Sequence, residues 1–174
     1  KRIKPDWRKT LNNKKIKVAE SITGPDEKKF IKNIILSGNY VSGPNVKLFE
    51  KKFSKKFNHQ NSVALNSGTA ALHCALIALG INSNDEVIVP SISFASTATS
   101  VLHNRSKPVF CDVSLENYCL DPDDLKKKIT TKTKAVIITH FTGNSCDMDK
   151  ISKIVKDKNV FLIEDCAQAH GTKY

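Results

Sequence analysis

From residue 63 onward, short apolar segments alternate with longer segments whose apolar positions recur at helical spacing. The short segments are mostly apolar at successive positions, which is typical of strands buried on both faces of a parallel sheet. They are Val63–Leu65, Glu86–Val89, Pro108–Val113, Ala135–Thr139 and Val160–Ile163. Strands of this kind, alternating with helices, predict an α/β fold with a mostly parallel sheet and helices on both faces.

Helices are predicted between these strands. Ala70–Leu79 is apolar on nearly every side, and Gly80 is placed to end it in the left-handed conformation. Asp121 and Asp147 each precede a helical pattern, so both are expected to cap the helix that follows. Ser96–Asn104 is predicted to be helical as well.

Two further helices are predicted before the first strand. Pro25 is followed by two acidic residues, which favours a helix start, and Gly38 is expected to end that helix. Pro44 opens the second helix, which runs to about Phe57 and carries lysines on the side opposite its apolar residues.

The domain organisation follows from length and periodicity. A chain of 174 residues favours one domain with a sizeable core. Residues 1–17 are basic and lack a clear period, so we interpret them as an N-terminal arm. Residues 18–174 are interpreted as the N-terminal part of a single large domain.

The formal net charge of +11 raises the possibility of nucleic-acid binding. The basic residues are nearly all lysines and are spread along the chain, so we interpret them chiefly as solvated faces. No apolar segment approaches the roughly 20 residues of a membrane span, and no signal peptide pattern is present. A cytoplasmic protein without nucleic-acid or membrane partners is expected.

The chain has five cysteines, an odd number, and no C-x-x-C pair. This pattern argues against a disulfide framework or a structural zinc site and favours a reducing compartment. Cys74 and Cys111 are expected to be small buried hydrophobic residues. No metal site is predicted.

The turn Asn66–Thr69 lies between a predicted strand and the Ala-rich helix. Gly68 allows a ligand to approach the backbone, and the first helical turn offers unpaired N–H groups at the positive end of the helix dipole. Ser67 and Thr69 add hydroxyl donors. This arrangement suits a phosphate group, although Ser67 or Thr69 could equally be an ordinary helix cap.

Ligands of parallel α/β sheets bind at the carboxyl ends of the strands. The residues there are Asn66–Thr69, Pro90–Phe94, His140–Gly143 and Glu164–Gln168. Phe94 would offer a flat ring, and Asp165 follows a buried strand, where a carboxylate needs a cationic or hydrogen-bonding partner. A phosphate, a flat ring and a protonated nitrogen together describe pyridoxal phosphate, whose ring acts as an electron sink.

Several segments, in order, resemble the DegT/StrS family of pyridoxal-phosphate-dependent nucleotide-sugar aminotransferases, which have the aspartate aminotransferase fold. The similar segments, between about Ile16 and Tyr174, are Tyr40–Pro44, Asn66–His73, Asn84–Ser91, Ser93–Ala98, Pro108–Val113 and Glu164–Gly171. The resemblance implies an aspartate-aminotransferase-like large domain that stops before the C-terminal domain.

The resemblance also implies roles for individual residues. Gly68 and Thr69, with Ser67, would hold the cofactor phosphate, and Phe94 would stack on the pyridine ring. Asp165 would pair with the ring nitrogen. The last residue of the implied cofactor site, placed against the ring near its phenolic oxygen, is Gln168. Phe94 could instead be core, Asp165 a helix cap and Gln168 a surface residue, while His140 and His170 receive no role.

The implied reaction transfers an amino group, typically from glutamate, to a nucleotide-linked keto sugar for polysaccharide biosynthesis. The family's Schiff-base lysine lies beyond the segment that Gln168 closes, so we expect it beyond Tyr174. We therefore expect a piece of a longer, homodimeric enzyme that is inactive alone. Three alternatives stay open: a sugar dehydratase of the same family, which has histidine in place of the lysine, a non-catalytic nucleotide-binding α/β module, and a nucleic-acid-binding domain.

Overall fold

The computed structural model of the protein describes residue 21 and residues 23–174. The arm expected at residues 1–17 lies outside the described residues. The chain divides into two compact units, Lys1–Leu48 and Phe49–Tyr174. The second unit contains the sheet and every candidate site residue.

The first two helices in the described part of the chain begin and end where the sequence predicts. Helix α2 (Pro25–Ser37) has proline at its first position, and the Glu27 side chain accepts a hydrogen bond from the Gly24 N–H at 2.7 Å. Gly38 ends it in the left-handed conformation, with φ of 71°. Helix α3 (Pro44–Phe57) extends across the division between the two units.

Among the residues that the structure describes, the sheet has four strands, all parallel, in the order β2-β1-β3-β4. Their bounds are Glu86–Pro90 for β1, Lys107–Cys111 for β2, Thr133–Thr139 for β3 and Phe161–Asp165 for β4. The two central strands, β1 and β3, are buried almost throughout, which explains their uninterrupted apolar sequence. The prediction of a parallel α/β fold is confirmed.

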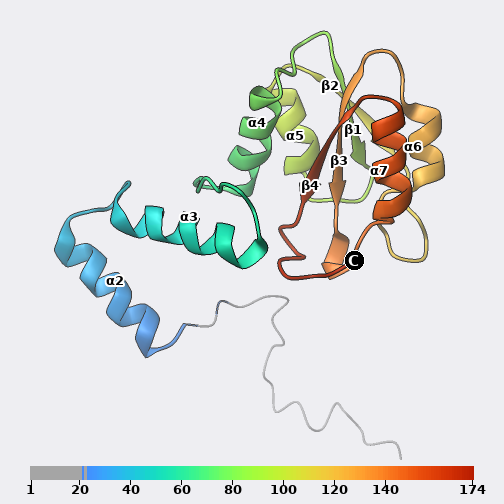
Figure 1. Ribbon diagram of the computed structural model, residues 1–174. Coiled ribbons are helices and arrows are strands. Elements are labelled where there is room, and N and C mark those ends of the chain that lie inside the picture. The colour runs from blue at the N-terminus through green and yellow to red at the C-terminus, as the bar shows by residue number, and fades with distance from the viewer. Residues whose placement is uncertain (1–20, 22) are drawn as a thin grey trace, which may run out of the picture. The chain divides into compact units, whose positions relative to one another are not determined.

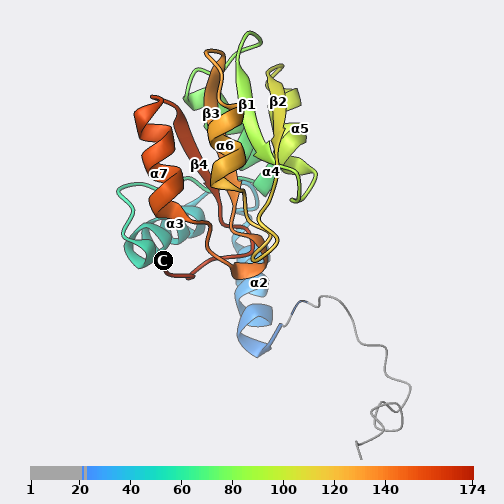
Figure 2. The same cartoon turned by 90° about the vertical axis from the view of Figure 1, so that its right-hand side faces the viewer.

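Helices cover both faces of the sheet (Figures 1 and 2). One face carries α4 and α5, which pack against each other, and the other carries α6 and α7. A short 3₁₀ helix, η1, follows β3. The bounds are Gly68–Ala78 for α4, Ser96–His103 for α5, Pro122–Lys128 for α6, Phe141–Gly143 for η1 and Met148–Asp157 for α7.

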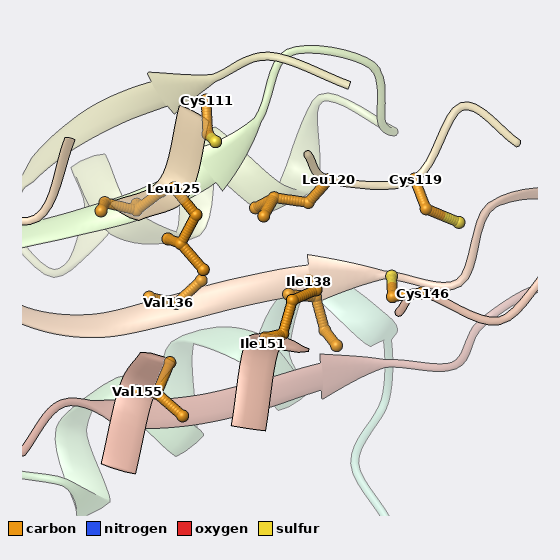
Figure 3. Close-up of a cluster of buried hydrophobic side chains, with 10 residues drawn as sticks. Cys111, Cys119, Leu120, Leu125, Val136, Ile138, Cys146, Ile151 and Val155 are labelled. Carbon is orange, nitrogen blue, oxygen red and sulfur yellow. The ribbon is translucent and has the colours of Figure 1, made fainter. Parts of the chain in front are cut away.

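Each face of the sheet has its own hydrophobic core. Under α6 and α7, Leu125 and Ile151 meet Val136 and Ile138 of β3, with three cysteines completing the cluster (Figure 3). Under α4 and α5, the buried residues are Leu72, Leu76, Ile81, Val87, Val89, Val101, Ala135 and Ile137. Alternate residues of β1 and β3 thus enter opposite cores, as the strand period requires.

The predicted helix caps are present. Asp121 accepts a hydrogen bond from the Asp123 N–H at 2.9 Å, and Asp147 accepts one from the Lys150 N–H at 3.1 Å. Gly80 has φ of 72° and donates its N–H to the Ile77 carbonyl, so it ends α4 as expected.

The strand predicted at Val63–Leu65 is wrong. Residues 61–65 have irregular backbone, and Val63 is 77% exposed. A strand forms only where a neighbour completes its hydrogen-bond ladder, and here the Ala64 N–H donates instead to the Glu50 carboxylate, at 2.9 Å. The turn at Ser67 therefore connects an irregular segment, rather than a strand, to α4.

The prediction for the cysteines is half wrong. Cys111 is buried, as expected, but Cys74 is exposed. Helix α4 buries Leu72 and Leu76, one turn apart, and Cys74 lies two residues from each, on the opposite side of the helix. The apolar composition of α4 concealed which side faces the sheet.

Candidate functional site

The candidate site lies at the edge of the sheet where the parallel strands end. Figure 1 shows α4 beginning at the same edge where β3 and β4 end. The first turn of α4, the segment after β1, η1 and the residues at the end of β4 are therefore all at this edge. These are the segments that the sequence selected.

The start of α4 is built to receive an anion. Ser67 is its N-cap, in extended conformation, and its hydroxyl accepts the Ala70 N–H at 3.1 Å. Within the described part of the chain, the Gly68 and Thr69 N–H groups donate to no protein acceptor. A Cβ atom added at Gly68 would meet nothing within 4 Å, so open space lies beside the Gly68 Cα atom at the start of the helix. Both the cap and the anion-binding interpretation of Ser67 are compatible with this geometry.

Phe94 is presented by a segment that hydroxyl groups hold in place. The Ser93 hydroxyl lies 2.7 Å from that of Thr97 and 3.0 Å from that of Thr139. Thr97 and Thr139 are buried, so Ser93 ties the segment after β1 to both α5 and the end of β3. The Phe94 ring is 76% exposed, and the alternative of a core residue is therefore wrong for this structure.

Asp165 and Gln168 both accept hydrogen bonds from the segment that follows β3. The His140 N–H donates to the Asp165 carbonyl at 3.2 Å, and the Thr142 N–H donates to Gln168 Oε1 at 2.8 Å. Asp165 is the last residue of β4, and one of its carboxylate oxygens, Oδ1, accepts the Ala167 N–H at 3.0 Å. The amide nitrogen of Gln168 donates to no acceptor among the described residues.

Hydrogen bonds thus connect the Phe94 segment to the end of β3, and the residues that follow β3 to the Asp165–Gln168 segment. The turn Ser67–Thr69 lies at the same edge but makes no hydrogen bond to Asp165 or Gln168. The structure places every predicted site residue at one edge of the sheet. A ligand would have to reach from the Ser67–Thr69 turn to Asp165 and Gln168.

A histidine–glutamate pair, His140 and Glu164, lies next to Asp165. His140 is buried, with Nε2 at 3.2 Å from the Glu164 carboxylate, while Nδ1 accepts the Cys146 N–H at 3.1 Å. The neighbouring Cys146 and Cys166 thiols and the Glu164 carboxylate raise the pKa of His140, and His140 lowers the pKa of Glu164. The bond to Nδ1 acts in the opposite direction for His140, because protonation would remove its acceptor. We therefore assign the neutral ring, with its proton on Nε2 facing Glu164.

The same pair belongs to a cluster of potential metal ligands. One atom each of His140, Glu164 and Cys166 lies within 4.8 Å of the others. A metal on Nε2 would require the ring proton on Nδ1, where the Cys146 N–H already donates. The hydrogen bonding therefore favours the histidine–glutamate pair over a metal ion.

Sequence reasoning missed His140, Glu164 and Thr142. The rule of strand ends selected their segments, but nothing in the chain shows that residues 24 apart form a pair. His170 is explained by packing, since its ring meets Phe53 and Phe57 edge-on, with centroids 5.8 and 6.1 Å away. Among the described residues, no helix is long and apolar enough to cross a membrane.

Comparison with known proteins identifies the class of this fold and site. Residues 21–174 match the DegT/DnrJ/EryC1/StrS aminotransferase family. The chain belongs to this family. The resemblance inferred from the sequence motifs is confirmed.

Three relatives illustrate the range of the family. The spore coat polysaccharide biosynthesis protein SpsC of Bacillus subtilis is 40% identical over 153 residues, 88% of this chain and 39% of SpsC. A dTDP-3-amino-3,6-dideoxy-α-D-galactopyranose transaminase of Aneurinibacillus thermoaerophilus is 38% identical over 141 residues, 81% of this chain and 39% of that protein. A solved GDP-4-keto-6-deoxymannose-3-dehydratase with a trapped PLP-glutamate geminal diamine has a TM-score of 0.85 at 27% identity. The match covers 92% of this chain and 43% of that structure.

The chain spans only 39% to 43% of the length of these relatives.

The prediction that pyridoxal phosphate is the cofactor is confirmed by the family and by its solved structures, which include PLP and PMP forms.

Proposed function

We propose that this chain is part of an enzyme that transfers an amino group to a nucleotide-linked keto sugar. The amino donor in this proposal is an amino acid such as glutamate. The observation that carries it is the gathering of an anion-binding helix start, an exposed aromatic ring, a carboxylate and an amide at one edge of the sheet, in a member of this family. The name of SpsC supports a place in polysaccharide biosynthesis.

The residues present fit pyridoxal phosphate. The open space beside Gly68 and the Gly68 and Thr69 N–H groups suit the phosphate, and the Ser67 and Thr69 hydroxyls can add to it. The exposed Phe94 ring would cover one face of a planar cofactor. When bound, the cofactor supplies an electron sink for the amino-group transfer.

Asp165 and Gln168 would set the electronic state of that ring. The Asp165 carboxylate would hold a proton on the ring nitrogen, because an anion nearby favours the protonated form. Gln168 accepts the Thr142 N–H through Oε1, so its amide nitrogen would remain available to donate to the ring oxygen. We place the lysine that binds the cofactor in residues beyond Tyr174.

Partners and location belong to the same proposal. We propose a homodimer in which the Asn39–Pro44 segment lies on the substrate side. All five cysteines are free thiols, which supports a reducing compartment such as the cytoplasm. We also propose that the protein has no nucleic-acid partner, which is supported by acidic residues that pair with lysines, such as Lys128 with Asp124 and Lys150 with Asp147.

A test uses the full-length gene product, pyridoxal phosphate, glutamate and a set of nucleotide-linked keto sugars. We expect visible absorbance from bound cofactor and transamination, with Asp165→Asn lowering kcat by on the order of 100-fold because the ring proton is lost. Asp157→Asn, on the exposed side of α7, is the matched control and should keep wild-type turnover. Wild-type turnover in Asp165→Asn would overturn the assigned role.

Sugar dehydration is the second candidate, because a solved relative of the same fold is a dehydratase. The residue that occupies the lysine position decides between them. Loss of water from the sugar without transfer of an amino group would favour this candidate. Binding of free nucleotide without pyridoxal phosphate, unaffected by Asp165→Asn, would instead favour a non-catalytic module.

A further inference from the structure

The segment His140–Gly143 is fastened to the rest of the site from two directions. On one side the His140 ring lies between the irregular segment after η1 and strand β4, with Nδ1 accepting the Cys146 N–H and Nε2 facing Glu164 of β4. The His140 side chain is only 8% exposed, so both of its ring nitrogens need partners. These bonds fix the position of the chain as it leaves β3.

On the other side, the segment binds the loop that carries the candidate cofactor residues. Three hydrogen bonds cross between them: His140 N–H to the Asp165 carbonyl at 3.2 Å, Thr142 N–H to Gln168 Oε1 at 2.8 Å, and Thr172 Oγ1 to the Gly143 carbonyl at 3.1 Å. Thr142 reaches Gln168 in a left-handed conformation, with φ of 54°. A β-branched residue adopts this conformation only where its surroundings enforce it.

We propose that His140 and Glu164 are positioning residues, whose pair holds the 140–143 segment so that Asp165 and Gln168 face the cofactor. This inference rests on the proposed function, which gives Asp165 and Gln168 their targets. Glu164 and Asp165 are adjacent on a strand, so their side chains point to opposite faces. Glu164 therefore acts through His140 and does not touch the cofactor itself.

The chemistry of the pair allows its two bonds to be removed separately. His140→Asn leaves an oxygen near the Nδ1 position, which can accept the Cys146 N–H, but loses the bond to Glu164. Glu164→Ala removes the same bond from the other side, while Glu164→Gln keeps an acceptor oxygen. His103→Asn, at an exposed position of α5, is the matched control.

The experiment measures the Kd of pyridoxal phosphate for the cofactor-free full-length protein and its variants, with circular dichroism to verify folding. We expect Glu164→Ala and His140→Asn each to raise Kd about 10-fold, and the double variant to be no weaker than either, because one bond is lost in all three. Glu164→Gln should stay within about 3-fold of wild type, since its oxygen still accepts. His103→Asn should match wild type.

If the pair contributed only to general stability, Glu164→Ala would lower the unfolding midpoint. In that case Glu164→Gln would not restore the Kd of pyridoxal phosphate, and the effects of the two single variants would not overlap in the double variant. A Kd for Glu164→Ala within about 2-fold of wild type, or effects that multiply in the double variant, would overturn the proposal. Loss of affinity in Glu164→Gln equal to that in Glu164→Ala would overturn it as well.

A second readout does not depend on the cofactor. Nitrogen NMR of the cofactor-free protein, at a pH near 7.5, should show the neutral His140 ring with its proton on Nε2. A neutral ring with its proton on Nδ1 would overturn the pair, because Nε2 would then have no proton to donate to Glu164. A charged ring would instead overturn the assigned bond from the Cys146 N–H, because Nδ1 could no longer accept it. If wild type binds no pyridoxal phosphate but shows this tautomer, the proposed function fails and the pair stands.

Discussion

Thr142 joins an unfavourable backbone conformation to a contact with the candidate site. Its φ and ψ of 54° and 23° lie in the left-handed region, where a Cβ atom crowds the backbone, yet its N–H is the donor to Gln168. Gly143, with φ of 87°, continues the turn. At the scale of single residues, the left-handed conformation of Thr142 thus costs free energy, and the surrounding hydrogen bonds offset that cost.

This strain predicts that glycine at position 142 gives a more stable protein than alanine, the reverse of their usual order. Thr142→Gly and Thr142→Ala both remove the hydroxyl, so they differ only by the Cβ atom. We expect the glycine variant to have the larger free energy of unfolding, by about 1 kcal/mol, because glycine adopts the left-handed region without a clash. Chemical denaturation of the full-length protein measures the difference. Equal stabilities, or a more stable alanine variant, would show that position 142 is unstrained.

At the scale of elements, short helices depend on their caps. Helix α6 spans only Pro122–Lys128, yet it places Leu125, with no exposed surface, in the core beneath it. A helix this short is not stable alone, so its position depends on packing and on the hydrogen bond that the Asp121 side chain accepts from the Asp123 N–H in the first turn. Pro122 has no N–H to satisfy at the first position.

Asp121→Ala should therefore lower the free energy of unfolding by about 1 kcal/mol, since the cap bond is lost. Asp121→Asn keeps an acceptor oxygen and should stay within a few tenths of a kcal/mol of wild type. Urea denaturation followed by circular dichroism distinguishes the two. An alanine variant as stable as the asparagine variant would mean that Asp121 does not cap α6.

At the scale of the whole molecule, stability and function are placed at opposite edges of the sheet. The site occupies the carboxyl edge, whereas Glu86 begins β1 at the amino edge. Its carboxylate accepts hydrogen bonds from Lys107 Nζ at 2.9 Å and from the Thr130 hydroxyl at 2.7 Å. These bonds tie together β1, β2 and the segment that enters β3, without touching the candidate site.

This arrangement predicts a loss of stability in acid. The Thr130 hydroxyl and Lys107 hold the pKa of Glu86 below its usual value of 4.5. Because the folded pKa lies below the unfolded one, the stabilisation is complete above pH 4.5 and disappears as the pH falls through the folded value. Unfolding free energy, measured between about pH 6 and pH 3, should thus fall less steeply for Glu86→Gln than for wild type.

Glu116→Gln provides the matched control for that measurement, because Glu116 is an exposed loop residue. Its curve should follow wild type. If Glu86→Gln and wild type have the same pH dependence, the ionised Glu86 contributes nothing at the amino edge.

Much of the fold could be predicted because its signals are local. The apolar segments of β1 and β3, the caps Asp121 and Asp147, and the turn at Gly80 each depend on a few neighbouring residues. The failures occurred where the outcome depends on distant partners. Val63–Leu65 has the composition of a strand but no ladder, and Cys74 lies on an apolar helix whose exposed side only packing could reveal.

The sequence by itself determined the parallel α/β fold, the family and the segments that carry the candidate site, because periodicity, capping residues and ordered motifs are written along the chain. Only the tertiary structure decided that His140 pairs with Glu164, that the Thr142 N–H holds Gln168, and that hydroxyls fix the Phe94 segment to β3. These contacts join residues that are 24 to 46 positions apart along the chain. Whether such residues meet in space depends on how β1, β3 and β4 pair within the sheet.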